Sequence, residues 1–584
     1  MISYSRHTTN MRVRWWLSLG IALVFLVPVA ATAAGIVDDG WVPPNFPKQG
    51  HVNVTISDNS GVLMGAGAPH LEWRNGKNGP DRLQILCKSL EDPRCSKASG
   101  EFIYFTRLAQ CSESNQIDCI EAIVAVKNGN EISGKQENLF PTAVKTTYLS
   151  DKSVNLPIAS SGGLWNFNGI SHAGGEKFFV NAVLSGSKDA SSKTFETDGF
   201  SITISAVEMR KTTKDDGSSY VLENSRPADG TFLGAVGIYP PYEDEQFLCV
   251  MSGDNLCAHR RALPEEIGFR VILRLSSSPS GWLHGRIDEG ALSIASLKPE
   301  GSVRVTLEGK SVRVPSLGFS YPWPAIPREI QEQYRKGKFN DESKLPSAGC
   351  RWCSDDPLVN TLDSHPLSYG PDAFQELDAW IGVRKDKADA DLSTWSVRTL
   401  SSDEMDGASK CFAKKSQVNG FVATNATIYS AGPPKLNKGS LDYQVAAPHL
   451  RSDGSEVLGR YKLIIRSDVA RCVYGFNDAP VSAVVTVTGG DGNSQVATTS
   501  VVERDGWISL SADNFTFSSP TIKVKLSQEG AGSTASVIPT PTPSSNTSVA
   551  VKSGKKTITC TKGFTTKRVT GVAPKCPKGF KQRS

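Results

Sequence analysis

The chain has 584 residues, with 64 Lys and Arg against 59 Asp and Glu and a formal net charge of +5. This length excludes a protein with a single hydrophobic core and predicts roughly three to five domains. The charge is unevenly placed: residues 35–551 hold 51 basic and 59 acidic residues, a net of −8, whereas residues 552–584 hold ten basic residues and no acid.

The N-terminus has the three parts of a secretory signal peptide. Arg6, Arg12 and Arg14 precede an apolar run over 17–29, and the small residues 30–34 follow, with an Ala-x-Ala site ending at Ala33. This order predicts a signal peptide over residues 1–34. The alternative is an uncleaved anchor, because 17–34 is at the short limit for a membrane span.

Short apolar runs separated by Gly, Ser, Asn and Asp follow from residue 35 to 317. Several alternate apolar and polar residues, as half-buried antiparallel strands do. The sequence therefore predicts a mainly β fold of antiparallel, sandwich-like domains, an N-terminal one over 35–150 and a second over 151–317.

Residues 318–405 are predicted to form a mixed, helical bridge. Pro327 opens a helix that runs through Lys338, and Pro371 opens a second that runs to about Val383. The second helix carries one apolar stripe, which we expect to pack in the interior: Phe374, Leu377, Trp380 and Ile381.

Seven strand-like runs in residues 406–528 predict a β-sandwich of immunoglobulin-like size. Alternating Pro539, Pro541 and Pro543 make 529–554 a flexible-to-extended Pro/Ser/Thr linker that cannot pack a core. Residues 555–584 are predicted to form a small basic hairpin module, too small to be stable without a Cys560–Cys576 bridge.

Twelve cysteines fall in neighbouring pairs, and three of the pairs share the spacing C-x7-C. In an exported chain an even count favours disulfides. Spacing does not fix the connectivity, but nearest-neighbour closure is the simplest pairing: Cys87/Cys95, Cys111/Cys119, Cys249/Cys257, Cys350/Cys353, Cys411/Cys472 and Cys560/Cys576.

Three stretches resemble uncharacterised multi-domain secreted actinobacterial proteins: ITCTKG…TKRVTGVAPKCPKGFKQ at the C-terminus, the YSAGPP…LDYQVAAPHL…SDVARCVYGF region, and RL…GWLHGR over 274–286. The first is similar to a short Cys/Lys-rich terminal module of that group. The resemblance implies an envelope location and a multi-domain β build. It carries over no catalytic residue.

No motif for chemistry is found in the sequence. The eight His form no H-x-x-x-H or H-E-x-x-H pattern, and nucleophile-elbow, P-loop and Rossmann signatures are absent, so no catalytic, cofactor or metal residue is assigned. Cys350 and Cys353 have zinc or redox spacing but stand alone, which favours a structural bridge.

The leading hypothesis is a secreted, cell-surface, non-enzymatic protein whose tail binds an anionic wall polymer or envelope surface. Nucleic acid is a poorer partner, because only two aromatics accompany the basic residues. The expected contacts are Lys552, Lys555, Lys556, Lys562, Lys567, Arg568, Lys575, Lys578, Lys581 and Arg583.

Two alternatives stay open. One is an extracellular, glycan-directed hydrolase with accessory β modules, because paired carboxylates meet only in space. The other is an adhesive module that uses exposed aromatics such as Trp165 or Trp282, although Trp282 lies in an alternating strand that favours a core position.

Overall fold

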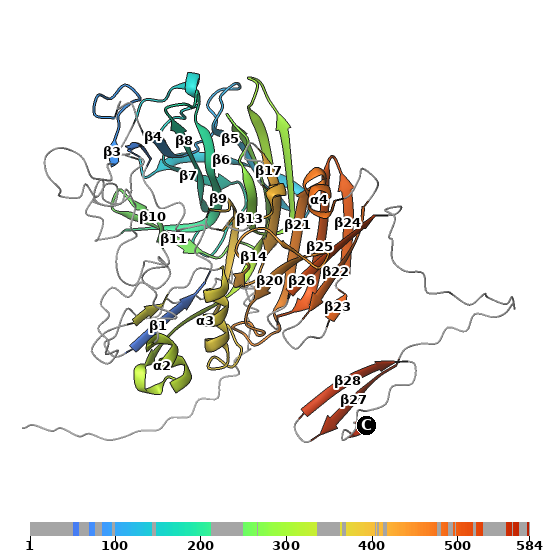
Figure 1. The fold of residues 1–584 in the computed structure, drawn as a ribbon. Helices are drawn as coiled ribbons and strands as arrows, with labels where there is room; N and C mark the ends of the chain where they lie inside the picture. The colour runs from blue at the N-terminus through green and yellow to red at the C-terminus, as the bar shows by residue number, and fades with distance from the viewer. Residues whose placement is uncertain are drawn as a thin grey trace, which may run out of the picture. The chain divides into compact units, whose positions relative to one another are not determined.

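The structure is a computed structural model, and it is mainly β, as predicted (Figure 1). It describes residues 51–57, 69–75, 84–95, 100–142, 148–211, 249–265, 267–335, 362–364, 369–402, 404–405, 408–412, 417–475, 481–488, 494–496, 498–517, 521–528, 556–562, 565–571 and 581–582. The predicted signal peptide, the Cys350/Cys353 pair and the Pro/Ser/Thr linker lie outside these residues. No helix among the described residues is both long and apolar enough to cross a membrane.

Twenty strands are joined by hydrogen bonds into one branched sheet system. They are β1 (His51–Ile56), β2 (His70–Arg74), β3 (Gln84–Leu86), β4 (Glu101–Arg107), β5 (Cys119–Lys127), β6 (Asn130–Phe140), β7 (Gly162–Phe167), β8 (Lys177–Asp189), β9 (Glu196–Lys211), β10 (Cys249–Gly253), β11 (Leu256–Arg261), β12 (Ile267–Leu275), β13 (Gly281–Ser296), β14 (Val303–Pro322), β15 (Leu362–Ser364), β16 (Ala390–Thr399), β17 (Val418–Thr424), β21 (Leu458–Arg466), β24 (Thr498–Arg504) and β25 (Trp507–Thr516).

A second sheet of six strands lies within the C-terminal part of the body, and three short α-helices are described. The strands are β18 (Ile428–Tyr429), β19 (Lys435–Asn437), β20 (Ser440–Ala446), β22 (Val481–Thr488), β23 (Ser494–Val496) and β26 (Thr521–Gln528). The helices are α2 (Arg328–Arg335), α3 (Pro371–Ile381) and α4 (Ser467–Tyr474).

Strand β12 shows how the alternating pattern becomes a buried layer. Phe269, Val271 and Leu273 are fully buried, and they alternate with residues that are only partly buried. Because successive side chains of a strand point to opposite faces, one face of β12 enters the core while the other carries Arg270 and Arg274. On its two edges β12 pairs with β5 and β14, both antiparallel.

Hydrogen bonds cross every predicted domain boundary within the body. β6 pairs with β7 across residue 150, and β14 runs without a break through residue 317. β13 pairs in parallel with β17, which joins the second predicted domain to the predicted sandwich. The chain up to Glu529 therefore forms one compact unit, and Gly530–Ser584 forms another.

The C-terminal part of the body is a two-layer sandwich-like arrangement (Figure 1). Buried residues of β21, such as Leu463, pack with buried residues of β20 and β26, such as Tyr443 and Val524. Helix α4 follows β21 directly and was not predicted from the sequence. It ends at Tyr474, and the next residue, Gly475, has a φ of 67°, the left-handed conformation that favours glycine after a helix.

The two predicted helices are present. α2 is described to Arg335, and the remainder of its predicted length lies outside the described residues. In α3, Leu377 and Trp380 are fully buried in a cluster with β1 and β14, with Phe374 and Ile381 packed against it. The predicted apolar stripe is therefore part of the packed interior.

The C-terminal unit contains a three-stranded antiparallel sheet: β27 (Lys556–Lys562), β28 (Thr565–Gly571) and β29 (Lys581–Gln582). β27 and β28 are the two strands of the predicted hairpin, paired from Lys556 opposite Gly571 to Lys562 opposite Thr565. β29 adds to the free edge of β27, with Thr561 opposite Lys581.

Candidate functional site

Four of the six predicted cysteine pairs are closed by disulfides. The Cα–Cα distances are 6.0 Å for Cys87–Cys95, 5.0 Å for Cys111–Cys119, 5.5 Å for Cys249–Cys257 and 5.8 Å for Cys411–Cys472. All three C-x7-C pairs therefore form short covalent loops. Cys350, Cys353 and Cys576 lie outside the described residues, as does the side chain of Cys560.

Five of the ten predicted basic tail residues have a described backbone. Lys556 and Lys562 lie on β27, Lys567 and Arg568 on β28, and Lys581 on β29. The structure thus brings residues from the two ends of the tail onto one small sheet. Lys552, Lys555, Lys575, Lys578 and Arg583 lie outside the described residues.

The two tryptophans of the adhesive hypothesis are buried. Trp165 is 0% exposed and Trp282 is 1% exposed. A side chain without accessible surface cannot serve as a platform for a ligand, so this hypothesis is wrong for both residues. Trp282 belongs to strand β13, and its side chain lies in the hydrophobic core, as the alternating sequence predicted.

The GWLHGR segment of β13 contributes to a buried polar cluster. His284 stacks on Tyr429 with ring centroids 3.8 Å apart, and the Arg286 guanidinium lies 4.8 Å from the same ring. Arg286 also donates to the carbonyl of Thr424 at 3.0 Å. This cluster joins β13 to the chain that follows β17, which is a structural role.

A buried ion pair extends this cluster. The two terminal guanidinium nitrogens of Arg398 each donate to Glu404 at 2.7 Å, and Nη2 also donates to the Tyr429 hydroxyl at 3.0 Å. Burial alone would lower the pKa of Arg398, but Tyr429 and Glu404 raise it well above its usual value. Both side chains are almost fully buried, at 4% and 1% exposed, so we assign the pair to the packing of the body.

One cleft in the described body has a volume of about 740 Å³ and is lined mostly by charged residues. Six acids line it, and four of them are paired with cations: Arg313–Glu265 at 2.7 Å, Lys310–Glu289 at 2.7 Å, Arg451–Asp391 at 3.7 Å, and Arg460–Asp288. A glycosidase needs two carboxyl groups available to a sugar and to water. The four paired acids are not available in this way, whereas Asp453 and Glu456 form no ion pair among the described residues.

A smaller cavity of about 280 Å³ lies beside the Cys111–Cys119 loop, and three segments form it. Residues 112–118 of the loop form one wall, and 150–158, which include the 3-10 helix η2 (Lys152–Val154), form another. Ser276, Pro299 and Ser302, at the ends of β12 and β13, complete it. Pairing of β5 with β12 and of β12 with β14 brings these distant segments together.

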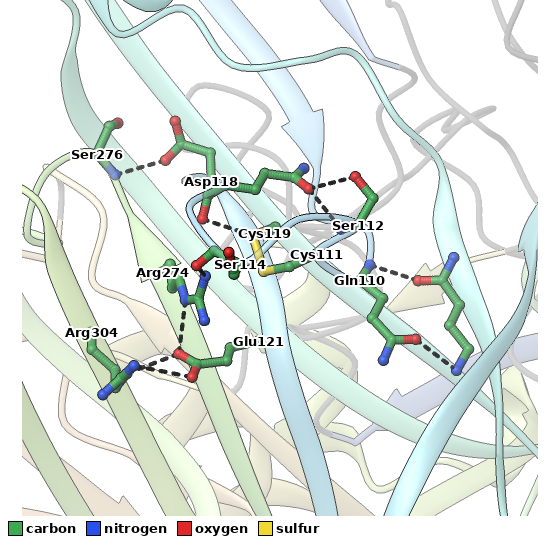
Figure 2. The surroundings of a disulfide bond; sticks show 12 residues. Gln110, Cys111, Ser112, Ser114, Asp118, Cys119, Glu121, Arg274, Ser276 and Arg304 are labelled. Carbon is green, nitrogen blue, oxygen red and sulfur yellow. Dashed lines mark hydrogen bonds and ion pairs between the residues drawn. A yellow bond between two sulfur atoms is a disulfide. The ribbon is translucent and has the colours of Figure 1, made fainter. Parts of the chain in front are cut away.

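The cavity loop is tied down at several points (Figure 2). The disulfide closes its neck, where the Cys111 amide also donates to the Ile120 carbonyl at 2.9 Å. Within the loop, Gln116 Oε1 accepts from the Ser112 amide at 2.7 Å. Arg274 of β12 donates to the Ser114 carbonyl. These restraints hold the wall in one shape before any ligand binds.

Glu121 holds Arg274 in place from beneath the loop. Arg274 Nε lies 3.0 Å from Glu121 Oε2, while Arg304 donates to both carboxylate oxygens at 2.8 and 3.0 Å (Figure 2). The hydrogen bond from Arg274 is the main reason why the pKa of Glu121 is below its usual value, and Arg304 lowers it further. Loop position and Glu121 ionisation are therefore linked.

Asp118 is a half-buried carboxyl of the cavity, and its pKa is shifted. Burial raises its pKa from 3.8 to about 6, although hydrogen bonds from Ser276 oppose the shift. The Ser276 amide donates to Asp118 Oδ1 at 2.8 Å. Among the described residues no Lys or Arg forms an ion pair with Asp118. Burial of an ionisable group with incomplete compensation is characteristic of functional sites.

Sequence reasoning did not find this cavity. Asp118 is the last residue before Cys119, and nothing in the pattern distinguishes it from acids in the other C-x7-C loops. A carboxyl with this pKa can hold a cationic donor above about pH 6 and can exchange a proton near it. In the described part of the chain no group of three or more His, Cys, Asp or Glu is placed to hold a metal ion.

Comparisons with known proteins add no assignment to this geometry. No protein-family model matches the chain, and no curated protein is found to be similar to it.

Proposed function

We propose that the protein is a secreted, envelope-associated, non-enzymatic β protein that binds an anionic wall polymer through its basic C-terminal unit. The observation that carries this proposal is the charge of residues 552–584, which hold ten Lys and Arg and no acid. The remaining chain after the predicted signal peptide has a net charge of −8. Attraction to a polyanion is therefore concentrated at one end.

The arrangement of the C-terminal unit supports multivalent contact. Gly530–Ser584 is compact by itself, so its cations belong to a module and not to the surface of the body. By strand register, Lys556, Lys562 and Lys567 occupy positions of one face of the sheet, and Arg568 and Lys581 occupy positions of the other. Cations at both faces suit a long, flexible polyanion.

The body supports the proposed location. Four disulfides close within its described residues, and disulfides persist in oxidising compartments outside the cytosol. The predicted signal peptide is consistent with the same location. In such surroundings the charged partners within reach are wall polymers and anionic headgroups. The proposal names wall polymers because a repeating phosphate chain can contact several cations of one unit.

The test compares two full-length variants with matched charge changes. One replaces five tail residues, Lys556, Lys562, Lys567, Arg568 and Lys581, by Gln; the other replaces five exposed body lysines by Gln, namely Lys127, Lys211, Lys298, Lys435 and Lys438. Co-sedimentation with purified phosphate-rich wall polymer is measured against salt. The screening length falls from about 8 Å at physiological salt to about 3 Å at 1 M.

We expect the wild type and the body variant to bind alike and to be released at about 1 M salt. The tail variant should lose at least about tenfold in affinity, because five of ten cations are gone. Equal binding by the tail variant, or retention of the wild type at high salt, would contradict the proposal. Membrane vesicles with an anionic lipid serve as the comparison for a headgroup partner, and tighter binding to them would also contradict it.

A further inference from the structure

The cavity beside the Cys111–Cys119 loop has the composition of a small-molecule site. Its lining combines apolar residues, among them Ile117, Ile158 and Pro299, with residues that carry hydroxyl, amide and carboxyl groups. Ligand sites in proteins combine apolar walls with a few placed polar groups in this way. A volume of about 280 Å³ suits a ligand of roughly ten non-hydrogen atoms.

Exposed apolar side chains gather at the same place. Five large hydrophobic side chains are exposed among the described residues, and two of them belong to the segment that lines the cavity. Ile158 lines it and is 56% exposed, and Leu149, which is 72% exposed, precedes the lining residue Ser150. Exposed apolar surface next to a cavity is typical of a site where a ligand binds and covers that surface.

The charge of the cavity selects a cationic ligand. Its charged lining residues are Asp118, Glu113 and Lys152, a formal sum of −1. Glu113 and Lys152 are exposed and reach solvent, whereas Asp118 is half-buried and has no cation beside it among the described residues. An anion desolvated in this way is stabilised most by a donor that carries positive charge.

A metal ion fits the cavity poorly. Calcium takes six to eight oxygen ligands, and the cavity offers carboxylates only from Asp118 and Glu113. A bare ion would also leave the exposed apolar side chains of Ile158 and Pro299 uncovered. An organic ammonium suits both the polar and the apolar lining residues, because its nitrogen donates to Asp118 while its carbon skeleton contacts the apolar side chains.

We propose that this cavity binds a small organic molecule that carries a primary ammonium group next to an apolar moiety. The ammonium donates to the Asp118 carboxylate, whose Oδ1 accepts from the Ser276 amide at 2.8 Å. The apolar moiety contacts Ile158 and Pro299. Because the disulfide and Arg274 already fix the loop, little ordering is needed on binding.

The proposal is tested with benzylamine and its neutral counterpart benzyl alcohol on the full-length protein, by ligand-observed NMR and isothermal titration. The variants are D118N, whose carboxamide still accepts the Ser276 amide, and the control E300Q, which removes an exposed carboxylate next in sequence to the lining residue Pro299. We expect D118N to weaken benzylamine at least about tenfold and E300Q to leave it unchanged. Benzyl alcohol should bind weakly to every variant.

Acidification gives a second readout. From pH 7.5 to pH 5 the ionised fraction of Asp118 falls to roughly a tenth, so benzylamine should bind about tenfold more weakly to the wild type. Tyr104 and Tyr148, which lie near Asp118, stay neutral over this range, because burial above all raises the pKa of each. Glu113 and Lys152 face the same cavity, and the E113Q and K152Q variants should retain the pH dependence.

Three results would overturn the proposal: no benzylamine binding to folded wild-type protein, equal binding by D118N, or benzyl alcohol binding as tightly as benzylamine. D118N folding is checked by its thermal transition. The test is independent of the C-terminal unit, so its failure leaves the wall-polymer proposal untouched.

Discussion

Two disulfide loops of the body have the same covalent length and different structures. Cys111–Cys119 and Cys249–Cys257 each span a sequence separation of eight. The second is a β-hairpin, in which β10 pairs with β11 around a turn at Asp254 and Asn255, with φ of 54° and 57°. The first contains no strand pairing between its two cysteines and instead forms the wall of a cavity.

The two loops differ in the non-covalent interactions that fix them in addition to the disulfide. The hairpin is held by its own backbone ladder, with Ser252 opposite Cys257 and Gly253 opposite Leu256. The cavity loop is held from outside by Arg274, which bonds the Ser114 carbonyl. A loop with its own ladder fills its interior with backbone, whereas a loop held from outside leaves room for a ligand.

The largest expected effect comes from removing each disulfide in turn. Replacing Cys111 and Cys119 by Ala, or Cys249 and Cys257 by Ala, should lower the free energy of unfolding by about 2–3 kcal/mol in either case, because the closed loops are equally long. Urea unfolding measures this. Only the first double variant should lose benzylamine binding, because the ladder preserves the hairpin in the second.

Amide hydrogen exchange gives a second measurement that distinguishes the two disulfide-deficient variants. Amides of β10 and β11 should remain protected without their disulfide, and amides of residues 112–118 should exchange faster without theirs. Equal loss of protection in both loops, or benzylamine binding that survives the loss of Cys111–Cys119, would show that the two loops are held in the same way.

The next effect on stability concerns Asp118, a partly buried carboxyl of the Cys111–Cys119 loop that has no counterpart in the Cys249–Cys257 hairpin. Its folded pKa of about 6 lies above the unfolded value near 3.8, so its contribution to stability is fully present below pH 3.8 and is lost as pH rises through 6. D118N should therefore stabilise the protein by about 2–3 kcal/mol at pH 7.5 and have little effect near pH 4. Thermal unfolding at both pH values measures it.

A D118N variant that is no more stable than wild type at pH 7.5 would show that Asp118 is not desolvated. Benzylamine provides the matching control, since saturation with it should stabilise the wild type at pH 7.5 more than it stabilises D118N.

Much of the fold could be predicted from local pattern, and the cavity could not. Alternation along β12 and the C-x7-C spacing each report on a few neighbouring residues, and these are the features that the sequence located correctly. The cavity depends on three segments that meet through β5–β12 and β12–β14 pairing, and no local pattern encodes that meeting. The parallel β13–β17 pairing is equally non-local, which is why the expected domain boundaries do not appear as breaks.

Helix α4 was not predicted, because its eight residues follow a strand directly and the main helix signal in the sequence is the glycine after it, Gly475.

The smallest expected effect concerns the hydrogen bonds and ion pairs that connect each loop to the rest of the body. Glu121 orients Arg274 under the cavity loop, and Asp254 accepts from the Thr142 amide at 2.8 Å beside the hairpin. E121Q should cost up to about 1 kcal/mol at pH 7, since the three charged groups are partly exposed. D254N should cost less, because Asn tolerates positive φ and its carboxamide still accepts from the amide.

The pH dependence gives E121Q its specific signature. The folded pKa of Glu121 is depressed, chiefly by Arg274, so the stability that it contributes is present above the unfolded pKa near 4.5 and is lost as pH falls through the folded value. The gap between wild type and E121Q in urea midpoint should therefore close on acidification from pH 7 to below pH 4. E121Q should also weaken benzylamine at pH 7.5, because Arg274 no longer fixes the loop. A gap independent of pH, or benzylamine affinity that D254N reduces as much as E121Q does, would show that Glu121 does not hold the cavity open.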